Sequence, residues 1–534
     1  MFHFSRLKKS SFVKLSRDSN QALGLGQFAI DFLGGKFGDK IEKKVYERAK
    51  LFHSDSVMCG ISALAMKTNA PCLLRREALT YPDPKGSLVF GSSIRVAPEK
   101  AICANSAAVR EWDSNGTVFG FNKKFPGHQA GEFGHNDFYP VIIAAASQRK
   151  SIDGKLALRA MVLSDEIRGR LAEVFSLKSH KIDHVVHGAI ASAAVYGALL
   201  GASASQIESA IGMTVAHYIP FRAIRAGKQL SDSKGSSAAL STEAAILSMR
   251  RSMAGFQGPR DIFRNPEAIF RYFEKTQNDS PFDIILSHSG DDFAVMGMHF
   301  KLGLYEHQSA GALQGVIDLL LKNPEILKKT EEISSITITS YEPAFGIIGD
   351  PAKKNPKTRQ SADHSMVFIV SRLIQRAAET AARGIFPSSS DEAWKLWMLA
   401  PFDYGITALQ DQRTKALMSK ISFKHGGPDY DKKYPDGIPT AVDISTKHGN
   451  HSSGMIMYPS GHSRNTTANL EDILNHKFQL LGRIALPDKE LSEMINKLES
   501  LETLSNSQVA ELYNFDWLKL QEHEPIDGHL GENS

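Results

Sequence analysis

The amino-acid sequence predicts a mostly α-helical protein, with a large all-helical domain and a smaller α+β lid domain. Its first half is filled with Ala- and Leu-rich stretches in which apolar residues recur at helical spacing. After Phe282, alternating or β-branched segments are mixed with helical ones. The chain has 534 residues, whereas single hydrophobic cores stop growing at roughly 250 to 300 residues. We therefore expect two domains.

The helical domain is expected to span residues 18–289. Periodicity predicts helices over Ala22–Met66, Asn136–Ser176 and Lys181–Ala204. Gly188–Ala204 carries no charge, and it is too short and too rich in small residues for a membrane span, so it predicts a close-packed central helix. A similar small-residue run follows at Ser236–Leu247.

The lid domain is expected to span residues 290–463. Three segments predict strands and two predict helices, namely Phe300–Leu304, Ile333–Tyr341 and Thr440–Ile444, and then Ala310–Leu321 and Ser365–Ala378. Gly426–Pro439 is dense in Gly, Pro, Asp and Lys, which predicts an exposed loop. The rest of the chain, residues 464–534, has Leu, Ile and Met at helical spacing from Leu470 to Trp517. We expect these C-terminal helices to return to the helical domain.

Residues 1–17 have the composition of an amphipathic mitochondrial transit peptide, and we expect it to direct the protein to the mitochondrial matrix. They carry five basic residues and no acidic one, with Phe, Leu and Val between them. A disordered basic tail is the alternative. The five charges of this segment account for the whole formal net charge of +5. The remaining chain is neutral, which argues against nucleic acid as the main partner.

The three cysteines, Cys59, Cys72 and Cys103, are too few for a disulfide framework and fit a reducing compartment. Three thiolates also hold an aconitase-type iron-sulfur cluster, so this possibility has to be weighed. No Cys-x-x-Cys pair is present, and Cys59 lies in an apolar run typical of a buried helix. Core packing is the favoured interpretation.

Acid-base chemistry is indicated most clearly between Arg110 and Asn136. This segment brings together Asp113, Thr117 and His135 around loop-forming glycines. Asp113 and His135 are suited to act as general base and acid, and Thr117 to bind a polar substrate group. The structural alternative is a turn at Asp113 and a loop histidine at position 135.

A cationic segment follows, in which Arg222, Arg225 and Lys234 precede an Ala-rich helix. Guanidinium groups bind carboxylates bidentately, so the segment is a candidate polycarboxylate site, although a solvated basic loop is the commoner fate of such a run. His184 and His187 compete for one position of a helix facing a pocket. Lys301 and His307 form a further cluster that, considered alone, is typical of a surface.

Other catalytic motifs are missing from the sequence. It has neither a phosphate-binding loop with Gly-Lys-Ser/Thr nor a Gly-x-Ser-x-Gly elbow. Phosphate transfer and serine hydrolysis are therefore unsupported.

Taken together, these segments resemble the MmgE/PrpD family, and most closely its 2-methylcitrate dehydratase branch. The resemblance covers nearly all of the chain after the leader. It is carried by Asp55–Ala63, Asp113–Thr117 with Gly134-His135, Asp183-His184, Arg222–Gly235, Phe300-Lys301 with Glu306-His307-Gln308, and Asn355–Ser365. Each segment is short, but their order and spacing together are specific. The His-Pro pair common in the family is His135-Asn136 here.

The resemblance implies a homodimer with a metal-independent site between the domains, no cofactor and a tricarboxylate substrate. The implied reaction is elimination of water from 2-methylcitrate in propionate catabolism. Catalytic roles would fall to Asp113, His135, Lys301 and His307, with either His135 or Asp113 removing a proton and a protonated His307 assisting the leaving hydroxyl. The substrate would be bound by Thr117, His184, Arg222, Arg225 and Lys234.

Three alternatives are left open. The first is decarboxylation of cis-aconitate on the same scaffold. The second is a helical scaffold without catalytic activity that binds organic acids or a partner protein through a basic cleft. The third is the aconitase-like cluster enzyme.

Overall fold

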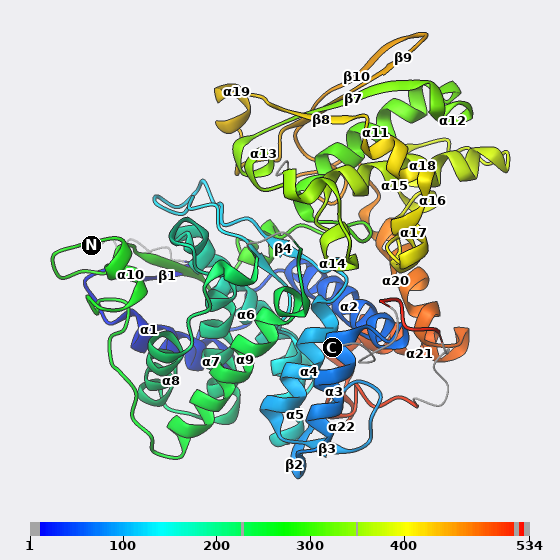
Figure 1. Cartoon of the computed structure of the whole chain (residues 1–534). Coiled ribbons are helices and arrows are strands. Elements are labelled where there is room, and N and C mark those ends of the chain that lie inside the picture. The colour runs from blue at the N-terminus through cyan, green and yellow to red at the C-terminus, as the bar shows by residue number, and fades with distance from the viewer. Residues whose placement is uncertain (1–10, 226–228, 349–350, 517–522, 528–534) are drawn as a thin grey trace, which may run out of the picture.

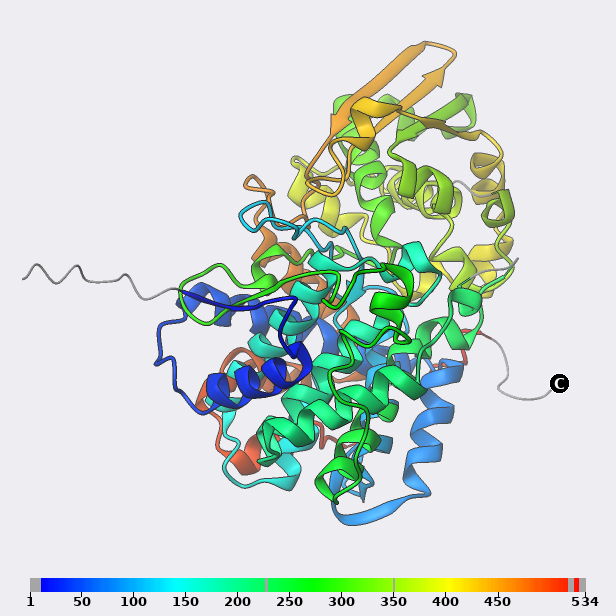
Figure 2. The ribbon, with the colours of Figure 1, turned by 90° about the vertical axis from the view of Figure 1, so that its left-hand side faces the viewer.

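A computed structural model describes residues 11–225, 229–348, 351–516 and 523–527 of the chain. Helices α1–α10 and α20–α22 gather into one mass, here called the helical region (Figure 1). Helices α11–α19 and strands β7–β10 form a second mass, the α+β region, which lies against it. A quarter turn of the molecule shows the same division (Figure 2). The predicted fold class is confirmed.

The first part of the helical region contains ten α-helices within the described residues. They are α1 (Gln21–Leu33), α2 (Lys43–Ala65), α3 (Asn69–Leu79), α4 (Pro98–Arg110), α5 (Pro140–Gln148), α6 (Gly154–Val174), α7 (Val185–Leu200), α8 (Ala204–His217), α9 (Asp232–Met253) and α10 (Ile269–Phe273). The long predicted helix over Ala22–Met66 is interrupted after Leu33. Gly35 takes a left-handed φ of 76° there, which ends α1 and lets the chain turn into α2.

The central helices α7 and α9 pack closely, as their small residues predict. Gly188 of α7 lies so near the ring of Phe138 that a Cβ atom would collide with it. Gly197 meets Met249 of α9 in the same way. Small residues therefore allow these helices to approach each other and place their ends at the functional site.

Three short two-stranded sheets accompany these helices, so the helical region is not purely helical. β1 (Phe12–Leu15) pairs with β6 (Ile284–Ser287), β2 (Pro82–Leu88) with β3 (Arg95–Val96), and β4 (Thr117–Val118) with β5 (Gly134–His135), all antiparallel. The predicted leader reaches residue 17 and so includes β1. Residues 1–10 lie outside the described residues. The leader stays a prediction, but a boundary at residue 17 would remove a paired strand.

The α+β region is built on one four-stranded sheet in the order β10-β9-β7-β8. Its strands are β7 (Ile333–Ser340), β8 (Ile421–His425), β9 (Thr440–Thr446) and β10 (Gly449–Ile456), and β7 and β8 run parallel while the other pairs are antiparallel. Its helices are α11 (Ala310–Lys322), α12 (Glu325–Lys328), α13 (Glu342–Ile348), α14 (Arg359–Ala362), α15 (Met366–Ala382), α16 (Ser390–Leu396), α17 (Ile406–Gln410), α18 (Gln412–Met418) and α19 (Pro428–Asp431).

The predicted strand over Phe300–Leu304 is wrong. This buried segment forms no ladder, because its amides bond to separate loops: Phe300 N–H donates to the Gly461 carbonyl and Leu304 N–H to the Leu399 carbonyl. Alternating apolar residues here fill the core between the two regions. The predictions for β7, β9, α11 and α15 are confirmed.

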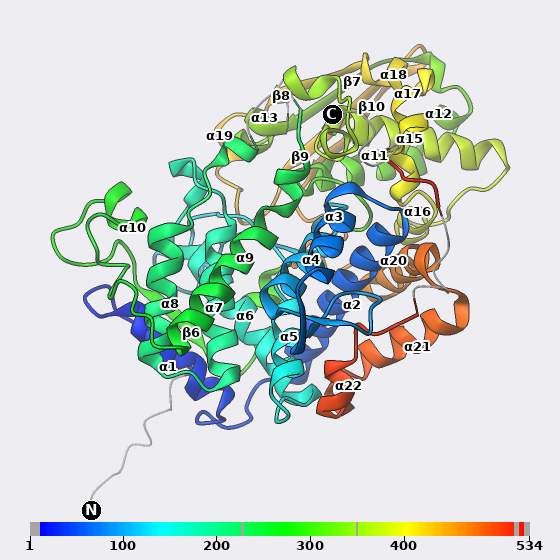
Figure 3. The same cartoon turned by 60° about the horizontal axis from the view of Figure 1, so that its bottom comes forward.

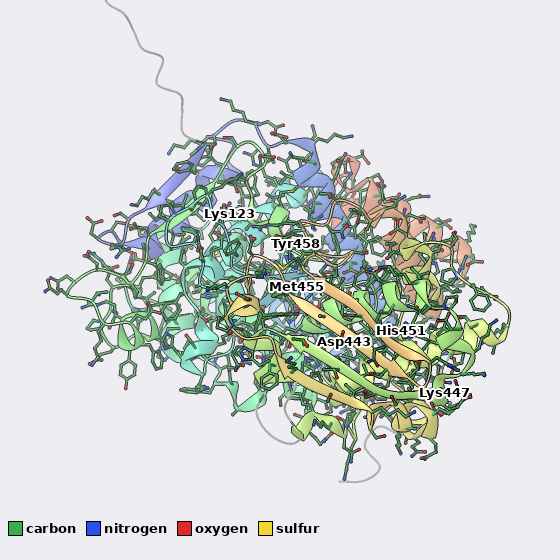
Figure 4. The ribbon with its side chains drawn as sticks, turned by 90° about the horizontal axis from the view of Figure 1, so that it is seen from above. Lys123, Asp443, Lys447, His451, Met455 and Tyr458 are labelled. Atoms are coloured by element: carbon green, nitrogen blue, oxygen red, sulfur yellow. The ribbon has the colours of Figure 1, made fainter. Side chains whose placement is uncertain are left out.

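The hairpin β9–β10 covers the top of the molecule, as the view from above shows (Figure 4). Asp443 lies on β9, His451 and Met455 lie on β10, and Lys447 lies at the turn between the strands. β10 is an edge strand whose ladder is interrupted by a register shift between Ser452 and Met455. Such irregularities limit pairing with other chains.

The C-terminal helices α20 (Leu470–Ala485), α21 (Asp488–Glu499) and α22 (Asn506–Ala510) return to the helical region (Figure 3). α20 packs along α2, and α22 packs on α5. This course agrees with the expectation from the sequence, except that Trp517 lies outside the described residues. No single helix in the described ranges is long and apolar enough to cross a bilayer, although the sharply bent pair α2–α3 passes the same test jointly.

Candidate active site

A cavity of about 670 Å³, counted with its open mouth, lies where the two regions meet. The helical region contributes Asp113, Thr117, Phe119, Phe133, His135, His184, Arg222, Arg225, Leu230 and Lys234, and the α+β side contributes Glu306, His307, Gln308, Lys353 and His364. Eight of the nine predicted catalytic and binding residues line this cavity. Seven of them belong to the helical region, and the eighth is His307.

Asp113 lies at the centre of the charged groups. It follows α4 with a left-handed φ of 50°, an uncommon conformation for a residue other than glycine, and is fully buried. Arg110 and Lys301 both bind Oδ1, and Oδ2 lies 2.7 Å from Nε2 of His364 and 3.4 Å from Nζ of Lys234. Four cationic or potentially cationic groups thus surround one carboxylate.

These neighbours decide the charge of Asp113. Burial by itself would raise its pKa, but Arg110, Lys234, Lys301 and His364 outweigh burial and hold the pKa well below the ordinary range. Asp113 is therefore a permanently ionised group that organises the cations. Both of its oxygens are already bound by these groups, whereas Nδ1 of His135 forms no hydrogen bond within the described residues, so of the two predicted bases His135 is the better suited.

His135 reaches the cavity from β5, which pairs with Thr117 of β4. Its Nδ1 lies 4.0 Å from Oδ1 of Asp113 and has no hydrogen-bond partner among the described residues. Burial, together with Arg110 and Lys301, lowers the pKa of His135 well below its ordinary value. The imidazole is neutral and has a free nitrogen, which is the form that a general base requires.

His184 precedes α7, and its ring lies edge-on to His135 at 5.3 Å between centroids. Burial lowers its pKa well below the ordinary range. His187, the competing residue, donates from Nε2 to the Phe175 carbonyl at 3.0 Å and is not among the residues that line the cavity. His184 is therefore the histidine that α7 directs to the site.

Arg222 and Arg225 differ in whether a carboxylate of the protein already binds the guanidinium group. Arg225 holds Asp183 bidentately, with Nη2 3.1 Å from Oδ1 and Nε in contact with Oδ2. Arg222 lines the cavity from the short helix η2 (Arg222–Ile224), and its buried Nη1 has no partner among the described residues. Arg222 is thus the arginine that has a free donor for a substrate carboxylate.

Lys234 lies in the first turn of α9 and is buried. Its Nζ is 3.4 Å from Oδ2 of Asp113 and 3.2 Å from Nδ1 of His364. Burial lowers its pKa to about 8, in spite of Asp113 and Asp363. Lys234 therefore carries its charge at neutral pH but loses it under mildly alkaline conditions.

Two predicted residues form contacts within the protein. Lys301 is not among the residues that line the cavity: its Nζ binds Asp113 from behind, through the carboxylate and at 2.8 Å through the backbone carbonyl. Its catalytic role stays a prediction, and in this arrangement it would act through Asp113. Thr117 lines the cavity, but its hydroxyl donates to the Gly134 carbonyl at 3.2 Å and so helps to hold β4 against β5.

Lys477 of α20 supports this arrangement from the far side. Its Nζ is fully buried and donates to the Ser114 carbonyl at 2.7 Å and to the Lys301 carbonyl at 2.8 Å, and it lies 2.6 Å from Oδ1 of Asp55. One ammonium group therefore fixes the segments that carry Asp113 and Lys301 relative to each other.

Glu306 and His307 represent the α+β side of the cavity. Burial raises the pKa of the Glu306 carboxyl, against the opposing effect of His364, so this group tends to hold its proton. Burial and Lys301 lower the pKa of His307 well below its ordinary value. The prediction of a protonated His307 is therefore wrong for the free protein, because a positive charge is disfavoured at this buried position.

His364 is the main residue that the sequence interpretation missed. It binds Asp113 through Nε2 at 2.7 Å and Asp363 through Nδ1. The signal was present, since Asp363-His364 lies in the Asn355–Ser365 segment that carries part of the family resemblance. Nothing in the local pattern placed it opposite Asp113, because the two residues are 251 positions apart and come from different regions.

Asp113, Asp363 and His364 also offer ligand atoms within 4.8 Å of one another, as a metal site would. Arg110, Lys234 and Lys301 already contact this group, so a metal ion would face three positive charges. These residues do not fit a metal well. The cysteines lie on α2, α3 and α4, and none of them lines the cavity, which disfavours a cluster there.

Comparison with known proteins supports the resemblance noted in the sequence. Residues 31–281 match the family model described as the MmgE/PrpD N-terminal domain. The chain is 23% identical over 446 residues to 2-methylcitrate dehydratase of Escherichia coli K12, across 82% of this chain and 86% of that protein. It is 24% identical to the mitochondrial 2-methylcitrate dehydratase of Yarrowia lipolytica, across 85% and 84%. A probable 2-methylcitrate dehydratase of Saccharomyces cerevisiae is 23% identical across 87% of each chain.

Proposed function

Because residues 31–281 match the MmgE/PrpD N-terminal domain model, we propose that this chain is a 2-methylcitrate dehydratase of that family. The reaction would eliminate water from 2-methylcitrate and yield 2-methyl-cis-aconitate, which makes the protein a hydro-lyase of propionate catabolism. The similar proteins from Escherichia coli and Yarrowia lipolytica have this name, and each matches more than four fifths of this chain.

The observation that carries this proposal is the combination of cations and a neutral histidine in one cavity. Arg222, Arg225, Lys234 and Lys353 line it, and His135 presents an unpartnered nitrogen beside them. A tricarboxylate requires positive groups for binding, and a β-elimination requires a base for the proton next to a carboxylate. One cavity supplies both requirements.

Substrate binding would fall first to Arg222 and Lys234, since Arg225 is already held by Asp183. A carboxylate bound by these cations acquires electron density when the neighbouring carbon loses its proton. The same cations stabilise that charge, and they act more strongly in a cavity from which water is excluded. Lys301 would act through Asp113, whose ionised state it helps to maintain.

His135 would take the proton from the substrate carbon, because its imidazole is neutral and available. The leaving hydroxyl would receive a hydrogen bond from His307 and a proton from Glu306. Glu306 is suited to supply the proton since its pKa is raised, whereas a neutral imidazole is suited to polarise the hydroxyl. The products are the unsaturated tricarboxylate and water.

We extend this proposal to the setting of the enzyme. The domain limits 18–289, 290–463 and 464–534 rest on the pattern of the sequence. Closure of the α+β region as a lid and a homodimer are implied by the family resemblance, and residence in the mitochondrial matrix by the resemblance and the predicted leader. The mitochondrial relative from Yarrowia lipolytica supports the location. Size-exclusion chromatography with light scattering tests the dimer, and a tagged chain with residues 1–10 deleted tests the leader.

The direct test is the rise in ultraviolet absorbance that an unsaturated tricarboxylate produces. The full chain, treated with a chelator, is mixed with 2-methylcitrate, citrate or cis-aconitate. We expect a rise with 2-methylcitrate that survives chelation. Release of carbon dioxide from cis-aconitate would replace the dehydratase by a decarboxylase, and loss of activity on chelation would favour a metal-dependent enzyme. Tricarboxylate binding without turnover would favour the binding scaffold.

A further inference from the structure

A second cavity, of about 440 Å³ with its mouth, lies next to the active-site cavity and has no role in the proposed reaction. His299, His462 and Arg464 line it, and Phe119 lines both cavities. His307 faces the first cavity and His299 the second, so two imidazoles and one phenyl ring separate the two spaces.

The two imidazoles are joined by a hydrogen bond. Nδ1 of His299 lies 3.1 Å from Nε2 of His307, and both side chains are buried. The remaining nitrogen of His307, Nδ1, is buried and has no partner among the described residues. His307 is therefore connected through one nitrogen to His299 and has its other nitrogen available for a ligand.

Packing holds both rings in place. Phe119 stacks on His299 with an interplanar angle of 2° at 4.9 Å and contacts the ring of His307 at 4.5 Å between centroids. The backbone of His299 is fixed as well, since it exchanges two hydrogen bonds with Thr117, at 2.8 and 3.0 Å. A ring held in this way cannot rotate freely to exchange its two nitrogens.

Both imidazoles are neutral. Burial lowers the pKa of each well below the ordinary value, and neighbouring charges act in the same direction: His462, Arg48 and Arg464 around His299, and Lys301 around His307, with only Asp113 opposing. A neutral imidazole has one N–H group and one acceptor nitrogen. The partner of one nitrogen therefore decides what the other can do.

The proposed reaction sets the direction of the hydrogen bond. His307 can polarise the leaving hydroxyl only if it presents an N–H group, and Nδ1 is its one nitrogen without a partner among the described residues. A neutral His307 that carries its proton on Nδ1 must accept a hydrogen bond at Nε2, so the proton of His299 is on Nδ1 and is donated there.

We propose that His299 is a positioning residue which fixes His307 as the Nδ1–H tautomer, so that the active-site cavity always meets a hydrogen-bond donor at this position. The inference rests on the proposed function for the identity of the group that receives this hydrogen bond, which is the leaving hydroxyl of 2-methylcitrate. Without His299, either nitrogen of His307 would be free to carry the proton, and the lone pair would face the hydroxyl in part of the molecules.

The first test reads the tautomer without any substrate. In protein labelled with nitrogen-15 histidine, the chemical shifts distinguish a protonated ring nitrogen from a bare one, and His307→Phe identifies the signals of His307. We expect a protonated Nδ1 in the unmodified protein, a mixture of tautomers in His299→Leu, and the original state in His299→Asn. Asn keeps an N–H donor as many bonds from the backbone as Nδ1 of histidine. A protonated Nε2 in the unmodified protein would overturn the proposal.

The second test is kinetic. We expect His299→Leu to lower kcat for 2-methylcitrate about 10- to 100-fold, as removing the partner of a functional histidine does elsewhere. KM should change less than about twofold, and His299→Asn should recover most of the loss. In the His307→Phe background, His299→Leu should have no further effect.

His187→Leu is the matched control, since it removes a buried histidine hydrogen bond outside the cavity. Unchanged kcat in His299→Leu, or equal losses in His299→Leu and His299→Asn, would overturn the positioning role and leave Glu306 as the sole donor. If the unmodified protein does not turn over 2-methylcitrate, the proposed function fails, whereas the chemical shifts still decide the tautomer.

Discussion

The two walls of the active-site cavity are built on different principles. The wall from the helical region carries its charges in local pairs, such as Arg225 with Asp183 and Arg110 with Asp113. The wall from the α+β region is joined to it: His364 pairs with Asp363 of its own region and also binds Asp113, and Lys234 reaches across to His364. The pairs of the helical wall are therefore self-contained, whereas His364 links the two walls.

The two walls also carry groups with different proposed roles. Substrate-binding cations and the proposed base belong to the self-contained wall, and the donors for the leaving group belong to the other. If the comparison holds, changes to the helical wall should impair chemistry and binding directly. Changes to the α+β wall should act mainly through the junction of the two regions.

The largest effect is expected for His135→Gln. Loss of a general base should lower kcat about 100- to 10,000-fold, while thermal unfolding stays close to that of the unmodified protein because Nδ1 of His135 forms no hydrogen bond within the described residues. Steady-state kinetics and calorimetry on the same preparation measure both. Near-normal turnover would show that His135 is not the general base.

A smaller effect is expected for Lys234→Met. Removing a charged hydrogen-bond donor costs about 1.5 to 3 kcal/mol, so KM for 2-methylcitrate should rise roughly 10- to 100-fold. Isothermal titration with a tricarboxylate that is not turned over checks whether binding is what is lost. An unchanged dissociation constant would mean that the helical wall binds the substrate elsewhere.

The pH dependence of the unmodified enzyme also tests the role of the Lys234 charge on the helical wall. Lys234 is charged below its pKa of about 8 and uncharged above it, so kcat/KM should be maintained at neutral pH and fall as the pH rises through about 8. Lys234→Arg keeps its charge over this range and should remove the fall. If kcat/KM falls equally with pH in both proteins, the fall is caused by a group other than Lys234.

The smallest effect is expected for His364→Asn on the opposite wall. Asp113 keeps three cationic partners, so stability should fall by only about 1 to 3 kcal/mol, and the change in kcat should be smaller than for His135→Gln. Denaturant unfolding followed separately for the two regions measures the loss. A loss of activity as large as that of His135→Gln would mean that both walls act in the chemistry.

Much of the architecture was predictable because helical periodicity is a local property. β7, β9, α11, α15 and the return of the C-terminal helices all followed from residue spacing. Phe300–Leu304 was mistaken for a strand, because alternation reports burial on one side and does not report whether a neighbouring strand is present. Interruptions such as the turn after Leu33 depend on the backbone conformation of particular glycines, and residue spacing does not reveal that conformation.

The site was predictable as a set and less so in its roles. Motif chemistry brought Asp113, His135 and Arg222 together, but it did not show that Lys301 stands behind Asp113 or that Arg225 is occupied by Asp183. Burial also reversed an expectation, since it makes His307 neutral. Such facts depend on contacts between segments far apart in the chain.

The position of Lys477 has a consequence for how the protein is made. The ammonium group that secures the Ser114 and Lys301 carbonyls belongs to α20, near the end of the chain. While the ribosome is still translating, every residue that lines the cavity has been synthesised before this lysine emerges. Catalytic competence is thus acquired only in the last stage of synthesis, and a polypeptide that terminates before α20 should accumulate without activity.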